Sequence, residues 1–208
     1  MEKKNLWTVY SEEQLAHLES LNEDYKKYLD AGKTERECVR EAVKQAEAAG
    51  YKNLDEVIAN GEAVKAGDKL YAVCMEKTLA LFCIGEEPLE KGMNILGAHV
   101  DSPRIDLKQN PLYEEAGFGL LKTHYYGGIK KYQWTAIPLA LHGVIVKTNG
   151  EKINVNVGEH EEDPIFTITD LLPHLAMEQM ERKLKEGIKG EDLNLLIGSM
   201  PYNDKEVS

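Results

Sequence analysis

Apolar positions in the first fifty residues recur with the period of a helix. Leucine and tyrosine return every three or four residues between residues 15 and 29, which predicts an amphipathic helix. Ser11 and Thr34 each have glutamine or glutamate three residues later, the spacing of a capping box that satisfies free backbone N–H groups at a helix start. We therefore predict two helices, the second ending at Gly50, and one more short helical turn near Leu54.

The apolar pattern shortens after the helices. Residues 69–75 and 78–84 are two apolar runs separated by a polar pair, which predicts a β-hairpin. Residues 94–100 form a third short run that is apolar on both sides, so we expect a strand in the interior of a sheet. Helices followed by a buried sheet predict an α/β layered fold.

Glycine and proline become frequent after Pro103, and strand signals dominate from there. Asn149-Gly150 is the strongest short hairpin signal, and it lies between apolar runs at 140–147 and 152–157. The second run alternates apolar and polar residues, which predicts a strand with one face toward water.

The last third of the chain predicts one helix and one strand. Asp170 is expected to cap a helix that continues to about residue 186, with a strand following at 193–198. We place the N-terminal part of an α/β domain at residues 1–108 and a mainly β module with one helix at residues 109–208.

The charge argues against two classes of partner, and the cysteine content indicates a cellular compartment. The formal net charge is −11, which argues against nucleic acid and against anionic membrane surfaces as partners. Three cysteines form no CxxC pair and cannot all be paired, which indicates a reducing compartment. No signal peptide or apolar run of membrane-spanning length is visible, so we expect a cytoplasmic protein.

His99 and Asp101 lie two residues apart at the end of the 94–100 run. Residues i and i+2 of a strand point to the same side, and active groups of α/β sheets gather at strand ends. A neutral imidazole binds zinc well, and a carboxylate behind it fixes its tautomer. The same spacing also suits a core histidine beside an exposed aspartate, so spacing alone does not establish a metal site.

The longer string around this pair resembles the first metal-ligand motif of the aspartyl aminopeptidase family of zinc metallopeptidases. It reads Leu-Gly-Ala-His-Val-Asp-Ser-Pro over residues 96–103. Three further segments resemble the family in the same order, and the resemblance covers about residues 71–201. These segments are Tyr126-Gly127-Gly128 with Trp134, the run Leu139 to Val146, and Asp170 to Ala176.

The resemblance implies a fold, an activity and roles for three residues. It implies a metallopeptidase-type α/β domain followed by an inserted β-rich dimerisation module. The activity would be that of a two-zinc aminopeptidase that releases N-terminal amino acids from peptides, assembled from dimers into homo-oligomers, commonly of twelve subunits. His99 would be a zinc ligand and Asp101 the catalytic aspartate that orients it. His174 would bind substrate in the active site of a neighbouring subunit.

Two departures from the family pattern qualify this expectation. Members selective for acidic N-terminal residues carry an aromatic-x-Arg segment after the tryptophan, whereas Trp134 is followed here by Thr-Ala-Ile-Pro. A neutral or broad preference is therefore expected. The family's remaining metal ligands and its general base follow the inserted module, and the chain stops before they should appear. The acidic pairs Glu114-Glu115 and Glu161-Glu162 lie in that module and have the pattern of solvated surface.

We therefore expect the N-terminal portion of a zinc aminopeptidase. The complete subunit would hold two zinc ions, while this chain alone would bind none tightly and would be inactive. The alternative, from a different class, is a non-catalytic assembly or regulatory module that retains the fold.

Overall fold

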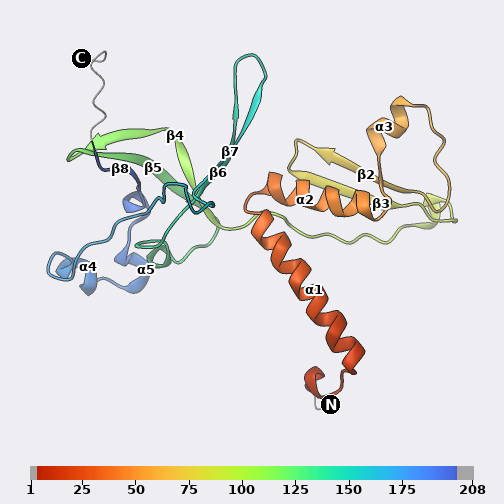
Figure 1. Ribbon diagram of the computed structural model, residues 1–208, viewed down its shortest axis with the longest axis horizontal. Helices are drawn as coiled ribbons and strands as arrows, with labels where there is room; N and C mark the ends of the chain where they lie inside the picture. The colour runs from red at the N-terminus through yellow and green to blue at the C-terminus, as the bar shows by residue number, and fades with distance from the viewer. Residues whose placement is uncertain (1–3, 201–208) are drawn as a thin grey trace. The chain divides into compact units, whose positions relative to one another are not determined.

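The chain divides into two compact units in a computed structural model that describes residues 4–200 (Figure 1). The first unit is Met1–Asp101 and the second is Ser102–Ser208. Strand β4 begins at Arg104 and continues past the predicted boundary after residue 108. The assignment of 1–108 and 109–208 to a peptidase part and a dimerisation module stays a prediction.

The helices of the first unit begin where the capping boxes predict. The Ser11 hydroxyl accepts the Gln14 backbone N–H at 3.2 Å, and the Gln14 side chain accepts the Ser11 N–H at 2.9 Å; Thr34 and Glu37 form the same pair of bonds. Helix α1 buries none of its residues, whereas α2 buries three. The helices are η1 (Leu6–Thr8), α1 (Glu12–Ala31), α2 (Glu35–Ala48) and α3 (Leu54–Ala59).

A three-stranded sheet completes the folded part of the first unit. Its order is β1-β2-β3, with β1 at Lys52–Asn53, β2 at Lys69–Cys74 and β3 at Thr78–Cys83. Strands β2 and β3 form the predicted antiparallel hairpin. The Tyr71 hydroxyl donates to the Glu47 carboxylate at 2.7 Å, which ties the sheet to α2.

The strand expected at residues 94–100 is not formed, and that prediction is wrong. After η2 (Leu89–Lys91), residues 92–103 belong to no helix or strand. Ile95 is 79% exposed and Leu96 100% exposed. A strand exists only through hydrogen bonds to neighbouring strands. Strand β2 pairs with β3, which follows it after a few residues. No strand in the described residues pairs with residues 94–100.

The second unit contains a long hairpin, a shorter hairpin and a closing strand. Its larger sheet has the order β4-β5-β8 with antiparallel pairing, and β6 and β7 form a separate pair. The predicted Asn149-Gly150 hairpin and the last strand are both confirmed. The strands are β4 (Arg104–Glu115), β5 (Phe118–Tyr126), β6 (Leu141–Val146), β7 (Lys152–Val157) and β8 (Leu195–Gly198).

The single helix expected from Asp170 to about residue 186 is wrong. The chain forms two short helices, α4 (Met177–Glu181) and α5 (Leu184–Gly187), and residues 170–176 are not helical. Proline disfavours helical geometry in the residue before it, and Pro173 follows Leu172 directly. Of the apolar residues of the expected helix face, Ala176 is buried, and the four larger ones are 60–68% exposed: Leu172, Leu175, Met180 and Leu184.

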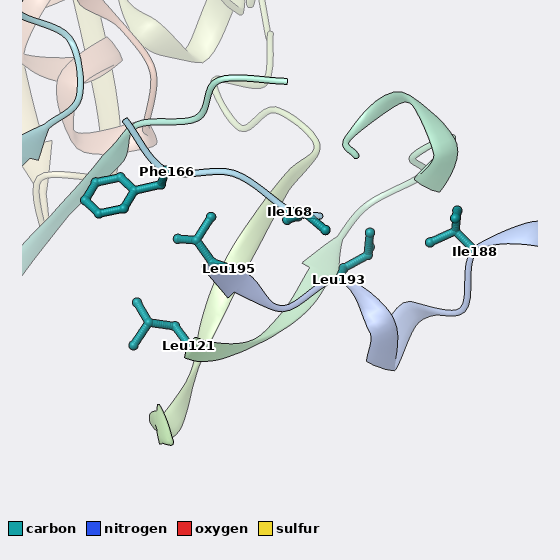
Figure 2. Packing of buried hydrophobic residues seen from close by; sticks show 6 residues of the cluster. All are labelled: Leu121, Phe166, Ile168, Ile188, Leu193 and Leu195. Carbon is teal, nitrogen blue, oxygen red and sulfur yellow. The ribbon is translucent and has the colours of Figure 1, made fainter. Parts of the chain in front are cut away.

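One apolar cluster forms the core of the second unit (Figure 2). Ile168 is 1% exposed and Leu193 is fully buried. Thr123 of β5 is the one polar residue of the described chain that is buried as a whole. Its hydroxyl donates to the Leu193 carbonyl, as buried polar groups in folded proteins usually find a partner. The cluster comprises Leu121, Phe166, Ile168, Ile188, Leu193 and Leu195. No helix in the described part of the chain is long and apolar enough to cross a membrane.

Candidate functional site

The structure brings the side chains of His99 and Asp101 together. His99 Nδ1 lies 3.3 Å from Asp101 Oδ1 and 2.9 Å from the Asp101 backbone oxygen. Both of these oxygens are acceptors, so they favour the tautomer that carries its proton on Nδ1. The lone pair of the neutral imidazole is then on Nε2, the arrangement found in metal-binding histidines whose other nitrogen donates to a carboxylate or carbonyl.

The surroundings of this pair differ from those predicted. The His99 side chain is 83% exposed and the Asp101 side chain 39% exposed. They lie in residues 92–103, hereafter the motif segment, which is not a strand. The expected convergence of imidazole and carboxylate is therefore present, but it comes from a local contact across two residues. The expected position at the end of a central strand is not observed.

The described residues do not form a zinc site by themselves. No group of three or more histidine, cysteine, aspartate or glutamate side chains within residues 4–200 is arranged to hold a metal ion. A catalytic zinc site takes three protein ligands and leaves one position open. His99 supplies one donor of that set. The metal-binding role of His99 and the catalytic role of Asp101 stay predictions.

His174 lies in the second unit, on the non-helical turn at residues 170–176, and is exposed. Asp170 anchors this turn. Its carboxylate accepts the Leu171 N–H at 2.8 Å, the Gln179 side-chain amide at 3.1 Å and the Thr135 hydroxyl at 3.3 Å. These bonds, that of Gln179 foremost, hold the pKa of the Asp170 carboxyl below its ordinary value because they stabilise the charged form. The substrate-binding role of His174 stays a prediction.

The same turn borders a hollow of about 380 Å³ that the sequence did not indicate. Thr135, Gln179, Arg182 and Lys189 contribute polar groups to its wall. The Gln179 amide oxygen is buried and has no hydrogen-bond partner in the described residues. Asp170 and Gln179 are nine residues apart, a spacing that matches no helical or strand period, so no sequence signal could have paired them.

His142 of the second unit contacts the carboxylate of Glu159 rather than a candidate site residue. Its Nε2 lies 2.9 Å from a carboxylate oxygen of Glu159, and its side chain is only 11% exposed. The histidine is part of β6, next to the start of the β6–β7 hairpin. The contact with Glu159 gives His142 a structural role in this unit.

Comparison with known proteins identifies the wider architecture. Residues 28–207 match the family model described as aminopeptidase I zinc metalloprotease (M18). A probable M18 family aminopeptidase 1 from Clostridium acetobutylicum is 55% identical over 205 residues, which are 99% of this chain and 44% of that protein. A probable M18 family aminopeptidase 1 from Thermotoga maritima is 41% identical, again over 99% of this chain and 44% of that protein.

Solved structures show the same fold. The M18 family aminopeptidase from Thermotoga maritima has a TM-score of 0.89 at 40% identity and covers 100% of this chain, which spans 44% of that structure. Aminopeptidase I from Clostridium acetobutylicum has a TM-score of 0.83 at 51% identity, over 97% of this chain and 44% of that structure. The mApe1 dodecamer of S. cerevisiae, 20% identical with a TM-score of 0.61, shares the fold.

The chain thus spans less than half the length of these relatives, and the match extends over nearly all of it. The family model covers more than half of the chain, including the motif segment and the turn that carries His174. The chain therefore belongs to the M18 family of aminopeptidase I zinc metalloproteases.

Proposed function

We propose that this chain is the N-terminal portion of a two-zinc aminopeptidase that releases N-terminal amino acids from peptides. The observation that carries the proposal is the His99–Asp101 contact, found within the Gly-Ala-His-Val-Asp-Ser-Pro string of a chain 55% identical to an M18 relative. The imidazole has its Nδ1 directed at acceptors and its side chain open to solvent. A metal-binding histidine almost always donates its other ring N–H to a carboxylate, a backbone carbonyl or water.

Each of the two residues has a separate task in this proposal. His99 offers Nε2 as one metal donor. Asp101 holds the ring by its Nδ1–H and keeps that tautomer populated, so it acts through the histidine. Because affinity for zinc comes from several preorganised donors together, this chain alone should exchange metal freely and show no turnover. The other donors and the general base would come from residues that this chain does not contain.

We further propose that the second unit is the β-rich dimerisation module of a cytoplasmic homo-oligomer. Support comes from its two antiparallel sheets, from the exposed turn that carries His174 and from a shared fold with a dodecameric protein. His174 would reach the active site of a neighbouring subunit and contact substrate. The three free thiols, Cys38, Cys74 and Cys83, suit a reducing compartment. The absence of arginine from the four residues that directly follow Trp134 supports a neutral or broad preference for the N-terminal residue.

A chimera tests the proposal without requiring any further sequence of this protein. Residues 1–208 are joined to the part of the Clostridium acetobutylicum relative that follows the matched region, and turnover of fluorogenic aminoacyl substrates is measured with added zinc, manganese or cobalt. The chimera should be active, and substrates with neutral N-terminal residues should be cleaved at least as well as acidic ones. The isolated 208-residue chain should show no turnover above blank.

Substitutions in the chimera separate the two roles. His99→Ala should reduce turnover to background, and Asp101→Asn should lower it by about 10- to 100-fold, the usual cost of losing a carboxylate that orients a metal ligand. His17→Ala, at an exposed position of α1, is the matched control and should leave turnover unchanged. A folded chimera without turnover would favour the non-catalytic assembly module. Turnover that survives His99→Ala would contradict the site.

A further inference from the structure

The hollow beside the turn at residues 170–176 has the size of a site for a small ligand. Its volume is about 380 Å³, near the lower end of the range of about 300–1,000 Å³ that is usual for ligand pockets. All of its lining residues belong to the second unit, between Thr135 and Asp192. His174 lies on the same turn but does not line the hollow. The hollow is therefore separate from the residue expected to contact substrate in a neighbouring subunit.

One buried acceptor in the wall of the hollow lacks a donor. Gln179 donates through Nε2 to a carboxylate oxygen of Asp170 at 3.1 Å. A charged carboxylate only accepts hydrogen bonds, so this contact determines which way the Gln179 amide is oriented. The amide oxygen Oε1 is buried and has no hydrogen-bond partner in the described residues. Because an unpaired buried acceptor costs free energy, a ligand that binds here should bring an N–H or O–H group.

Two cationic side chains, Arg182 and Lys189, also line the hollow. Arg182 Nη2 lies 2.6 Å from a carboxylate oxygen of Glu178. The hydrogen bond and charge of Arg182, and then the charge of Lys189, hold the pKa of the Glu178 carboxyl below its ordinary value. Lys189 is thus close enough to act on this pair. A guanidinium group has five N–H donors, so Arg182 and Lys189 together keep donors for an anionic group of a ligand.

The wall of the hollow therefore carries charges of both signs. Its acids are Asp170, Glu178 and Asp192, and its bases are Arg182 and Lys189. A simple anion would meet the three carboxylates, and a simple cation would leave the basic donors unused. A water molecule can donate to the unpaired amide oxygen, but it brings no charge to either set. A small zwitterion satisfies both sets, because charge-assisted hydrogen bonds form at each of its ends.

Two leucines in the same wall favour an apolar group between the ends of that zwitterion. Leu171 is 54% exposed and Leu175 is 64% exposed, and both line the hollow. A ligand that covers them removes apolar surface from water, which favours binding. The lining thus combines acceptors for an ammonium group, donors for a carboxylate and apolar surface for a side chain.

We propose that this hollow binds a free α-amino acid with an apolar side chain of about the size of leucine. Its ammonium group donates to Gln179 Oε1 beside the Asp170 carboxylate, and its α-carboxylate accepts from Arg182 and Lys189. Such an amino acid is also what the proposed function would release, so the hollow would hold a product of the enzyme. That last link rests on the proposed function, whereas the binding site does not.

Isothermal titration calorimetry of the 208-residue chain with L-leucine tests the proposal. Leucine should bind one-to-one with a Kd below about 1 mM. Leucinamide lacks the carboxylate and 4-methylpentanoate lacks the ammonium group. Each should bind at least about tenfold more weakly than leucine, because each loses the charge-assisted hydrogen bonds of one end. Leucinamide or 4-methylpentanoate binding as tightly as leucine would overturn the zwitterion site, as would a chain that binds none of the three.

Substitutions with matched controls test the assigned residues. Lys189→Met and Gln179→Met each keep a long side chain while removing one polar partner of the ligand, and each should weaken leucine binding by about tenfold. Lys185→Met removes an exposed lysine of α5 that does not line the hollow, and it should leave the Kd unchanged. His174→Ala should also leave it unchanged. Circular dichroism checks that each variant is folded.

The outcomes separate this site from the proposed peptidase chemistry. An unchanged Kd in Lys189→Met, which alters an exposed residue, would overturn the proposal even if Gln179→Met fails to fold. Loss of leucine binding in His174→Ala would also overturn it, because the amino acid would then be bound by the residue expected to contact substrate. The titration measures no turnover, so absence of binding would leave the aminopeptidase function untouched.

Discussion

The two units of the molecule differ in where their apolar residues lie. In the second unit, six buried residues from four segments meet in one cluster, and two of them, Ile168 and Leu193, are almost fully enclosed. In the first unit, the buried residues of the described chain all lie between Cys38 and Tyr71. Helix α1 buries nothing, and the motif segment exposes leucine and isoleucine to solvent.

This difference follows from the distance along the chain over which each element finds its partner. The hairpins β4–β5 and β6–β7 pair across short turns, and β8 and the 166–168 segment close the core over them. A strand from the interior of an α/β sheet takes neighbours from distant parts of a chain. The segment that carries the candidate chemistry is therefore the one with the least cover of its own.

The largest expected effect is on the free energy of unfolding, when a leucine is replaced by alanine in each of the two units. Leu193→Ala removes a fully buried side chain and should lower the free energy of unfolding by about 2–5 kcal/mol, through lost burial and the cavity left behind. Leu96→Ala alters a side chain that is 100% exposed, and it should change the free energy by less than about 0.5 kcal/mol. Urea denaturation of the 208-residue chain measures both. Equal losses of unfolding free energy in the two variants would contradict the difference in burial between Leu193 and Leu96.

A second comparison uses the two capping boxes, which have the same chemistry on helices of different burial. Thr34→Ala removes the hydrogen bond that the Thr34 hydroxyl accepts from the Glu37 N–H at the start of α2. Because α2 has a buried face, this loss should destabilise the first unit by about 1 kcal/mol. Ser11→Ala removes the matching bond from α1, which buries nothing. It should reduce helicity by circular dichroism without shifting the main urea transition. A larger shift for Ser11→Ala would show that α1 has a packing partner in solution.

The smallest effect concerns the turn that carries His174. The pKa of Asp170 is lowered in the folded state, first by the Gln179 hydrogen bond. The stability that this carboxylate contributes is therefore complete above its ordinary pKa of 3.8 and is lost as the pH falls through the lower folded-state pKa. Because the carboxylate is exposed, the contribution should be below about 1 kcal/mol. Asp170→Asn should lower stability at pH 7 and reduce the loss below pH 4, as followed by urea denaturation. Glu161→Gln, an exposed acid outside this network, should leave the pH dependence unchanged.

Much of the local structure could be predicted from short-range signals. The capping boxes at Ser11 and Thr34 locate two helix starts, and Asn149-Gly150 locates a hairpin turn. These features depend on residues within a few positions of each other. The 94–100 strand could not be predicted correctly, because an apolar run indicates what would be buried and not whether a partner strand is present. The 170–186 helix failed because hydrogen bonds to Asp170 and the effect of Pro173 outweigh its apolar period.

The candidate site also has one part that the sequence predicts and another that it does not. The His99–Asp101 contact is local, and the spacing of two residues was enough to anticipate it. The Asp170–Gln179 anchor and the hollow beside it depend on the path of the chain between α4 and Thr135. The periodicity of the sequence does not predict such a path.

Amide hydrogen exchange of residues 93–100 tests most directly the claim that this part of the motif segment has no partner strand among the described residues of the chain. In the isolated 208-residue chain, these amides should exchange at nearly unstructured rates, while β2 exchanges at least about a hundredfold more slowly than the free peptide. In the chimera with the Clostridium acetobutylicum relative, residues 93–100 should become as protected as β2. Strong protection of 93–100 in the isolated chain, or fast exchange in an active chimera, would contradict the account.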